Sequence, residues 1–187
     1  PDGSGVIRPT EGTIASRVPP RMRVRQDAPL ELSHVMLLCD DARNVLFDTL
    51  ARCAQDLTPA YDFPLNMDGG RLCGYAIASP AHLQMLEDAF CTAAADAHCR
   101  NGADAPFLVV GDGNHSLAAA KAHWEALKKA GAPCDHPARW AMVEIVNIHD
   151  PAVCFAPIHR IVLDCDVQAL CEAMVRAGQK RGITVRF

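Results

Sequence analysis

Apolar residues along this chain fall into two patterns, short continuous runs and longer stretches with helical spacing. The short runs predict β-strands, and apolar residues three and four positions apart predict amphipathic helices. The predicted strands cover residues 34–39, 106–110, 140–148, 153–163 and 183–187. The predicted helices cover residues 42–57, 80–99, 117–130 and 167–180. Strands and helices therefore mix along the chain without strict alternation.

Turn and capping signals mark the boundaries of several elements. The sequence Met67-Asp68-Gly69-Gly70 lies between two strand-like stretches and predicts a β-hairpin. A capping hydroxyl on Ser79, followed by Pro80, predicts a helix start. Asp166 is positioned to cap the last predicted helix in the same way.

The order of these elements predicts the fold class and the domain organisation. We expect an α/β (or α+β) fold in a single domain over residues 34–187, with a mixed sheet and flanking helices. Residues 1–33 are rich in Pro, Gly and Arg and are predicted to form an irregular basic N-terminal arm. Because the chain begins at Pro1 without a methionine, we expect that part of the full-length N-terminus is missing.

Net charge narrows the possible partners. The 187 residues carry a formal net charge of −4, so the surface as a whole is not suited to wrapping nucleic acid. Residues 8–25 are an exception, because they hold five arginines and one carboxylate, Glu11. This basic segment is either a solvated surface or an arm that grips phosphate.

Cysteine spacing and hydropathy predict a cytoplasmic protein. The nine cysteines are irregularly spaced and form no CxxC pair, which argues against a zinc ribbon and a disulfide scaffold. We interpret them as reduced thiols and expect no structural zinc. No apolar stretch approaches the ~20 residues needed to span a bilayer, so we expect no membrane partner.

The strongest candidate site is the run Gly111-Asp112-Gly113-Asn114-His115-Ser116, which follows an apolar run and precedes a predicted helix. Backbone N–H groups at a helix start lack internal partners and carry partial positive charge. Glycines let an anion approach the backbone closely. The loop therefore suits a phosphate group. The same residues also suit an Asx turn that caps the helix, and the sequence leaves both interpretations open.

Two further segments carry candidate chemistry. Glu11 lies on a Pro- and Gly-containing loop beside Arg8, where it is either a general base or a surface carboxylate in an ion pair. His159 and Arg160 interrupt the predicted strand at 153–163 and are candidate phosphate ligands. A histidine on an apolar strand is also a common core residue, so this alternative stays open.

Four motifs, in this order, resemble those of the bacterial domain-of-unknown-function 1015 family. They occupy residues 7–13, 25–34, 111–116 and 156–160. The resemblance runs through most of the chain.

That family is in turn similar to the ParB/sulfiredoxin-like superfamily, which includes nucleotide-dependent free-serine kinases. The resemblance implies a ParB/sulfiredoxin-like element around the glycine loop. Those kinases carry an Asp-Gly-His-His-Arg phosphate loop, which matches positions 112–116. Here Asn114 and Ser116 replace the first histidine and the arginine of that loop, and Glu11 takes the place of the kinases' catalytic glutamate.

The resemblance implies a protein that binds ATP or ADP with Mg²⁺ and transfers a phosphoryl group to a small hydroxyl substrate. The catalytic residues in this hypothesis are Glu11, Asp112 and His115, with Mg²⁺ near Asp112. The phosphate ligands are Gly111, Gly113, Asn114, Ser116, Arg8, His159 and Arg160. The alternative is a non-catalytic, ParB-like module that responds to nucleotide and regulates or associates with DNA. A thiol redox role is disfavoured, because the loop contains no cysteine.

Overall fold

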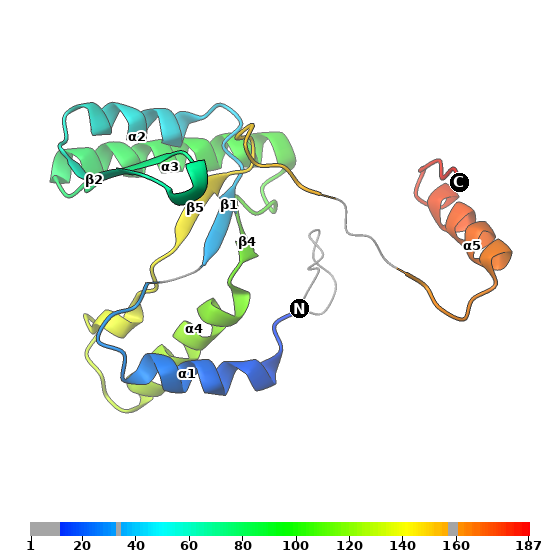
Figure 1. Ribbon diagram of the computed structural model, residues 1–187, viewed down its shortest axis with the longest axis horizontal. Coiled ribbons are helices and arrows are strands. Elements are labelled where there is room, and N and C mark those ends of the chain that lie inside the picture. Colours follow the sequence, from blue (N-terminus) through cyan, green and yellow to red (C-terminus); the bar gives the residue numbers. More distant parts are fainter. Residues whose placement is uncertain (1–11, 33–34, 157–160) are drawn as a thin grey trace. The chain divides into compact units, whose positions relative to one another are not determined.

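The computed structural model describes residues 12–32, 35–156 and 161–187 (Figure 1). The chain divides into two compact units, Pro1–Val153 and Cys154–Phe187, and each is described by itself. Within the described residues, every helix is too short or too polar to cross a membrane.

A three-stranded mixed sheet lies at the centre of the first unit. Its middle strand is β1 (Met36–Cys39), which pairs antiparallel with β4 (Leu108–Asp112) and parallel with β5 (Glu144–Asn147). The expected mixed sheet with flanking helices is therefore confirmed. Strands β1 and β5 lie within predicted apolar runs, whereas β4 extends two residues beyond the run predicted at 106–110. Strands β1 and β5 are shorter than predicted, since the pairing between them covers four positions.

Helices α2 (Val45–Gln55) and α3 (Pro80–Asn101) contact each other and cover one side of the sheet (Figure 1). The hydrophobic core contains Cys39 of β1, Ala93 and Ala97 of α3, and Phe107 just before β4. The two alanines are four positions apart and share one helix face, so the helix can approach the sheet closely. Phe90 of α3 meets the Phe107 ring edge-on, with 5.1 Å between the ring centroids.

Both predicted local signals around α3 are confirmed. The hairpin consists of β2 (Pro59–Pro64) and β3 (Arg71–Tyr75), joined through a 3₁₀ turn at Asn66–Asp68. The Ser79 hydroxyl accepts a hydrogen bond of 3.2 Å from the backbone N–H of His82 and so caps α3.

The predicted irregular arm is wrong for part of its length, because helix α1 (Val18–Gln26) forms there. Proline is tolerated in the first turn of a helix, where its missing N–H has no partner to lose, and Pro19 and Pro20 occupy that turn. The following arginines and methionine are good helix formers. Helix α1 packs against α4 (Asn114–Lys129) (Figure 1).

The second unit contains one helix, α5 (Val167–Gln179), among its described residues. Asp166 accepts a hydrogen bond of 3.1 Å from the N–H of Ala169, which confirms the predicted cap. The strand predicted at 183–187 is wrong. The N–H of Ile183 instead bonds the carbonyl of Gly178 at 2.9 Å, so the chain turns back onto its own helix end.

The strand predicted at 153–163 is also wrong over its described residues, 153–156 and 161–163. An apolar run forms a stable strand only where a neighbouring strand accepts its backbone hydrogen bonds. The described part of this run pairs with no strand. Its apolar side chains stay in solvent, including Ile161 and Leu163.

Candidate functional site

The glycine loop is shorter in the structure than in the sequence pattern, because the neighbouring elements extend into it. Strand β4 ends at Asp112 and helix α4 begins at Asn114, which leaves Gly113 alone between them. Gly113 has φ 84° and ψ 18°, a left-handed conformation that L side chains rarely adopt. Its carbonyl accepts the first helical hydrogen bond, from the N–H of Leu117 at 2.9 Å.

The backbone donors of the loop divide into two groups. The N–H of Gly113 donates to Oδ1 of Asp112 at 2.7 Å, so this donor is already engaged. The N–H groups of residues 114, 115 and 116 lie in the first turn of α4, and no described residue accepts a hydrogen bond from them. The set of donors available to an anion is therefore residues 114–116, rather than the 113–116 set of the sequence pattern.

His115 is buried, with 7 % of its surface exposed. Its Nε2 accepts a hydrogen bond of 3.0 Å from the backbone N–H of Ile14. An imidazole nitrogen that accepts a hydrogen bond carries no proton, so in the neutral ring the proton is on Nδ1. Any hydrogen bond from the His115 side chain to a ligand must therefore come from Nδ1.

Asn114 makes the second contact between the loop and the N-terminal segment. Its Nδ2 donates to the Thr13 hydroxyl at 3.2 Å. The two hydrogen bonds join positions 101 residues apart in the chain. They bring the end of the sequence motif at residues 7–13 to the start of α4.

Four of the predicted site residues lie outside the described residues: Arg8, Glu11, His159 and Arg160. Gly111 is described, and it belongs to β4 rather than to a loop. A Cβ atom added there would lie 3.0 Å from Cγ of Leu38 on β1. This glycine therefore relieves crowding between two paired strands, a role that the sequence pattern did not indicate.

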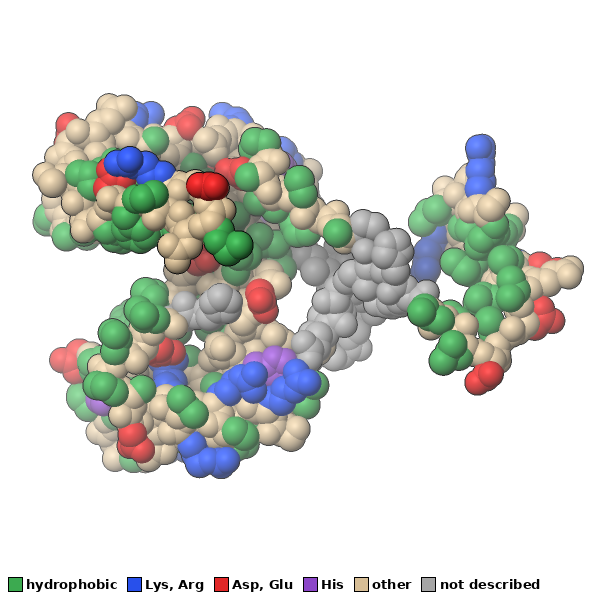
Figure 2. Space-filling model, viewed as in Figure 1, with side chains coloured by type: hydrophobic (Ala, Val, Ile, Leu, Met, Phe, Trp, Pro, Cys, Tyr) green, Lys and Arg blue, Asp and Glu red, His purple; other side chains and the backbone are tan. Residues whose placement is uncertain are grey.

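Ser116 lies in the wall of a pocket between α1 and α4, with a volume of ≈ 430 Å³. The wall residues are Pro20, Arg21, Val24, Arg25, Ala28, Leu30, Glu31, Leu32, Ser116 and Ala119. Lys and Arg side chains lie over α1 in Figure 2. The arginine-rich composition of residues 8–25 predicts a basic arm and does not indicate a pocket. The signal that could have found it is the helical spacing of Arg21, Val24, Arg25 and Ala28.

Comparison of the sequence with family models finds one family that covers most of the chain. The model described as "Protein of unknown function (DUF1015)" matches residues 2–181. The chain belongs to the DUF1015 family. No curated protein and no solved structure matches the chain.

A second polar cluster of this DUF1015 protein lies at the other end of the sheet, and sequence analysis missed it. Asp40 follows β1, and its Oδ1 lies 2.5 Å from Nε2 of His149, in the turn after β5. Arg100 donates to Oδ1 of Asp40 at 3.1 Å, and Asn101 donates to Oδ2 at 2.5 Å. The signal was polar residues directly after two apolar runs, since the ends of neighbouring parallel strands meet at one edge of a sheet.

Partial burial of Asp40 disfavours its charged form and opposes a low pKa. The hydrogen bonds from His149, Arg100 and Asn101, with the charge of Arg100, outweigh that effect and lower the pKa of Asp40. Its carboxylate is thus held by partners on two other segments of the chain, the end of α3 and the turn after β5.

Asp41 and Asn147 complete this end of the sheet. The Asp41 carboxylate accepts hydrogen bonds from the N–H groups of Val45 and Leu46 at 2.9 and 2.8 Å, and so caps α2. Asn147 donates to the carbonyl of Asp41 at 2.9 Å. These contacts explain why the DUF1015 chain buries two polar side chains here.

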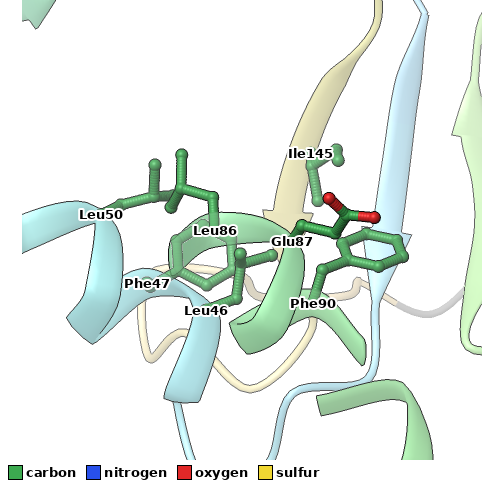
Figure 3. A pocket seen from close by; sticks show the side chains of 7 residues that line it. All are labelled: Leu46, Phe47, Leu50, Leu86, Glu87, Phe90 and Ile145. Atoms are coloured by element: carbon green, nitrogen blue, oxygen red, sulfur yellow. The ribbon is translucent and has the colours of Figure 1, made fainter. Parts of the chain in front are cut away.

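The pocket in Figure 3 is different in character from the one beside Ser116. It has a volume of ≈ 380 Å³ and is formed by side chains of α2, α3 and β5. Its wall residues are Leu46, Phe47, Leu50, Leu86, Glu87, Phe90 and Ile145. The one charged group in this wall is a carboxylate, so the pocket is unsuited to phosphate.

Proposed function

We propose that this DUF1015 protein binds a nucleotide or another phosphate compound at the start of α4, where it acts as a nucleotide-dependent kinase of a small hydroxyl substrate. The observation that carries the proposal is the pair of hydrogen bonds from Ile14 to His115 and from Asn114 to Thr13. They link the loop to Thr13 and Ile14, which follow in the chain the segment at 8–11 that resembles the glutamate motif of free-serine kinases. In the chain, one residue separates Glu11 from Thr13.

The backbone N–H groups of residues 114–116 are the proposed phosphate donors. They lie in the first turn of a helix of 16 residues, where the partial positive charge of the helix end supports an anion. The left-handed Gly113 keeps the approach to them free of a side chain. Ser116, Arg8 and Arg160 are proposed to supply further donors and positive charge, and His159 a further contact.

The proposed cofactor is ATP or ADP with Mg²⁺. Asp112 has one carboxylate oxygen engaged by Gly113, and its other oxygen is the proposed ligand to the metal, directly or through water. Magnesium supplies charge neutralisation for the phosphoryl group. His115 contributes by holding the N-terminal segment, since its Nε2 is engaged by Ile14.

In the proposed reaction, a substrate hydroxyl attacks the γ-phosphorus of ATP and Glu11 accepts the hydroxyl proton. The new O–P bond forms as the bond to the bridging oxygen breaks, and ADP leaves with its electron pair. The resemblance to the ParB/sulfiredoxin-like superfamily supports this assignment. Ser116 replaces the arginine of the kinase loop and so removes one charged phosphate partner, and Asn114 replaces its first histidine. Binding of nucleotide is therefore the first part of the proposal to test.

Titration calorimetry with ATP, ADP and CTP in the presence of Mg²⁺ tests nucleotide binding. We expect saturable heat with at least one nucleotide, and weaker binding without Mg²⁺. Absence of heat with all three, for the folded full chain, would rule out the proposal. Kinase activity is then tested by ADP release with L-serine as the first hydroxyl acceptor, with Glu11→Gln as the variant expected to bind nucleotide but release no ADP.

A non-catalytic, nucleotide-responsive module that associates with DNA is the second candidate. The observation in its favour is the group of basic side chains over α1 (Figure 2). Salt-dependent retention on a DNA column supports this function, because displaced counterions make such binding weaken steeply with salt. A chain that flows through the column at low salt is inconsistent with it.

A further inference from the structure

The pocket between α1 and α4 has apolar side chains in its wall that folding leaves in solvent. Val24, Leu30 and Leu32 are 78 %, 70 % and 77 % exposed. They come from α1 and the segment after it, and Pro20 and Ala28 line the same pocket. Exposed apolar side chains around a concave pocket are typical of a ligand-binding site.

The two arginines in the wall differ in how their charge is balanced. Arg25 forms an ion pair with Glu31, also donates to the carbonyl of Trp140 at 3.2 Å, and is largely buried. Arg21 donates to the backbone carbonyl of Arg17 at 3.1 Å and contacts no carboxylate among the described residues. The pocket therefore combines an apolar wall with one guanidinium whose charge no described side chain balances.

We propose that this pocket binds a small organic oxyanion, a carboxylate or a phosphate monoester with an aliphatic body. The oxyanion pairs with Arg21, and the hydrocarbon covers Val24, Leu30 and Leu32. Ser116, on the opposite wall, offers a hydroxyl to the same anionic end. A volume of ≈ 430 Å³ falls within the range of small-molecule sites. This site goes beyond the proposed nucleotide site, with which it shares Ser116, and its occupancy does not require nucleotide.

Titration of the full chain with a graded series of probes, in the absence of nucleotide, tests the proposal. The probes are butyrate, hexanoate, hexyl phosphate and hexanol, followed by calorimetry or by ligand-observed NMR. We expect hexanoate or hexyl phosphate to bind, with hexanol at least tenfold weaker. Hexanoate should bind more tightly than butyrate by about two- to fourfold for each added methylene. The stronger of the two six-carbon anions identifies the oxyanion.

Two variants on the same helix separate a built site from general electrostatic attraction. Arg21→Gln removes the unbalanced charge in the wall, and Arg23→Gln removes the same charge from an exposed position outside it. We expect Arg21→Gln to weaken the tighter anion about tenfold, as for loss of a charged hydrogen bond, and Arg23→Gln to weaken it less than twofold. Circular dichroism should show both variants folded.

Three results would overturn the proposal. Equal losses in the two variants would mean that the anions respond to net charge alone. Equal affinity for hexanoate and hexanol would mean that Arg21 contributes nothing. Absence of binding by both six-carbon anions to the unaltered chain would mean that another class of molecule, such as a peptide, covers the apolar wall. Nucleotide titrations are separate, so failure here leaves the proposed function intact.

Discussion

The two ends of the three-stranded sheet differ in whether their polar groups are hydrogen-bonded within the chain. At the end where β1 finishes, the Asp40 carboxylate has donors from His149, Arg100 and Asn101, and Asp41 caps α2. At the end where β4 finishes, the first N–H groups of α4 have no acceptor among the described residues. The polar groups at the Asp40 end join segments of the chain to one another. The N–H groups at the α4 end are left as donors for a ligand.

This difference separates a structural polar cluster from a candidate site better than residue type does. By composition, the Asp40 cluster resembles an active site, with a carboxylate, a histidine and an arginine in contact. Its carboxylate groups are already satisfied by the chain itself, and a group in that state stabilises the fold. The α4 end contains less reactive side chains. Its backbone N–H groups at residues 114–116 have no acceptor, and Arg21 has no carboxylate partner, among the described residues.

The largest effect on the fold is expected at the end of the sheet where β1 finishes, because its polar groups are hydrogen-bonded within the chain. Asp41 is 2 % exposed, and its two oxygens accept hydrogen bonds from the N–H groups of Val45 and Leu46. Asp41→Ala removes both acceptors and leaves buried donors unpaired, so the free energy of unfolding should fall by about 2–3 kcal/mol. Urea denaturation followed by far-UV circular dichroism measures this loss.

Asp104 is the matched control for Asp41, because it is an exposed aspartate. Asp104→Ala should change the free energy of unfolding by less than about 0.5 kcal/mol. Nucleotide affinity should be unchanged in both variants, since the glycine loop lies at the other end of the sheet. An Asp41 variant as stable as the Asp104 variant, or one that loses nucleotide binding while folded, would remove the distinction between the two ends.

At the end where β4 finishes and α4 begins, we expect substitutions to cause a smaller loss of stability and a larger loss of nucleotide binding. Gly113→Ala places a Cβ on a residue with φ 84°, which costs about 1–2 kcal/mol of backbone strain. The same Cβ stands beside the donors of residues 114–116. We therefore expect nucleotide affinity to fall at least tenfold, as measured by calorimetry on the folded variant.

Gly131, just beyond the other end of α4, is a close control for Gly113. It also has a positive φ, 90°, and a Cβ there would meet no atom within 4 Å. Gly131→Ala should cost similar stability and leave nucleotide affinity unchanged. If the two variants lose affinity equally, the loss comes from strain in the helix and not from the loop.

Elements whose signals are local could be predicted from the sequence. The Ser79 and Asp166 caps, the hairpin and the strand before the glycine loop all depend on residues within a few positions of one another. The strand predicted at 183–187 is wrong, and so is the one at 153–163 over its described residues, because a strand also needs a partner, which a local pattern does not reveal. The helix at 18–26 departs from the predicted irregular arm, because prolines disrupt the interior of a helix but are compatible with its first turn, where Pro19 and Pro20 lie.

The site was predictable in part for the same reason. The glycine and the helix start are local features, and the structure has both. The contacts of Asn114 and His115 with residues 13 and 14 span 101 positions, so no pattern within the loop reveals that His115 is engaged by the backbone. The Asp40 cluster depends on three separate segments and was missed altogether.

The smallest effect is expected from the pH dependence of the Asp40 cluster. Hydrogen bonds and the charge of Arg100, against a cost of partial burial, lower the pKa of Asp40 in the folded chain. A carboxyl with a lower pKa when folded stabilises the fold above its unfolded pKa, and this contribution is lost as the pH falls through the folded pKa. Because Asp40 and its partners are partly exposed, the contribution should stay below about 1 kcal/mol.

Asp40→Asn tests this pH dependence against the unaltered chain. The difference in melting temperature between the two proteins should be largest near neutral pH and shrink on acidification toward pH 3, where the native carboxyl is increasingly protonated. Thermal unfolding in a series of buffers of equal ionic strength measures it. A difference that grows on acidification has the wrong sign for a carboxylate held by donors. In that case the charge of Asp40 would not be what stabilises this end of the sheet.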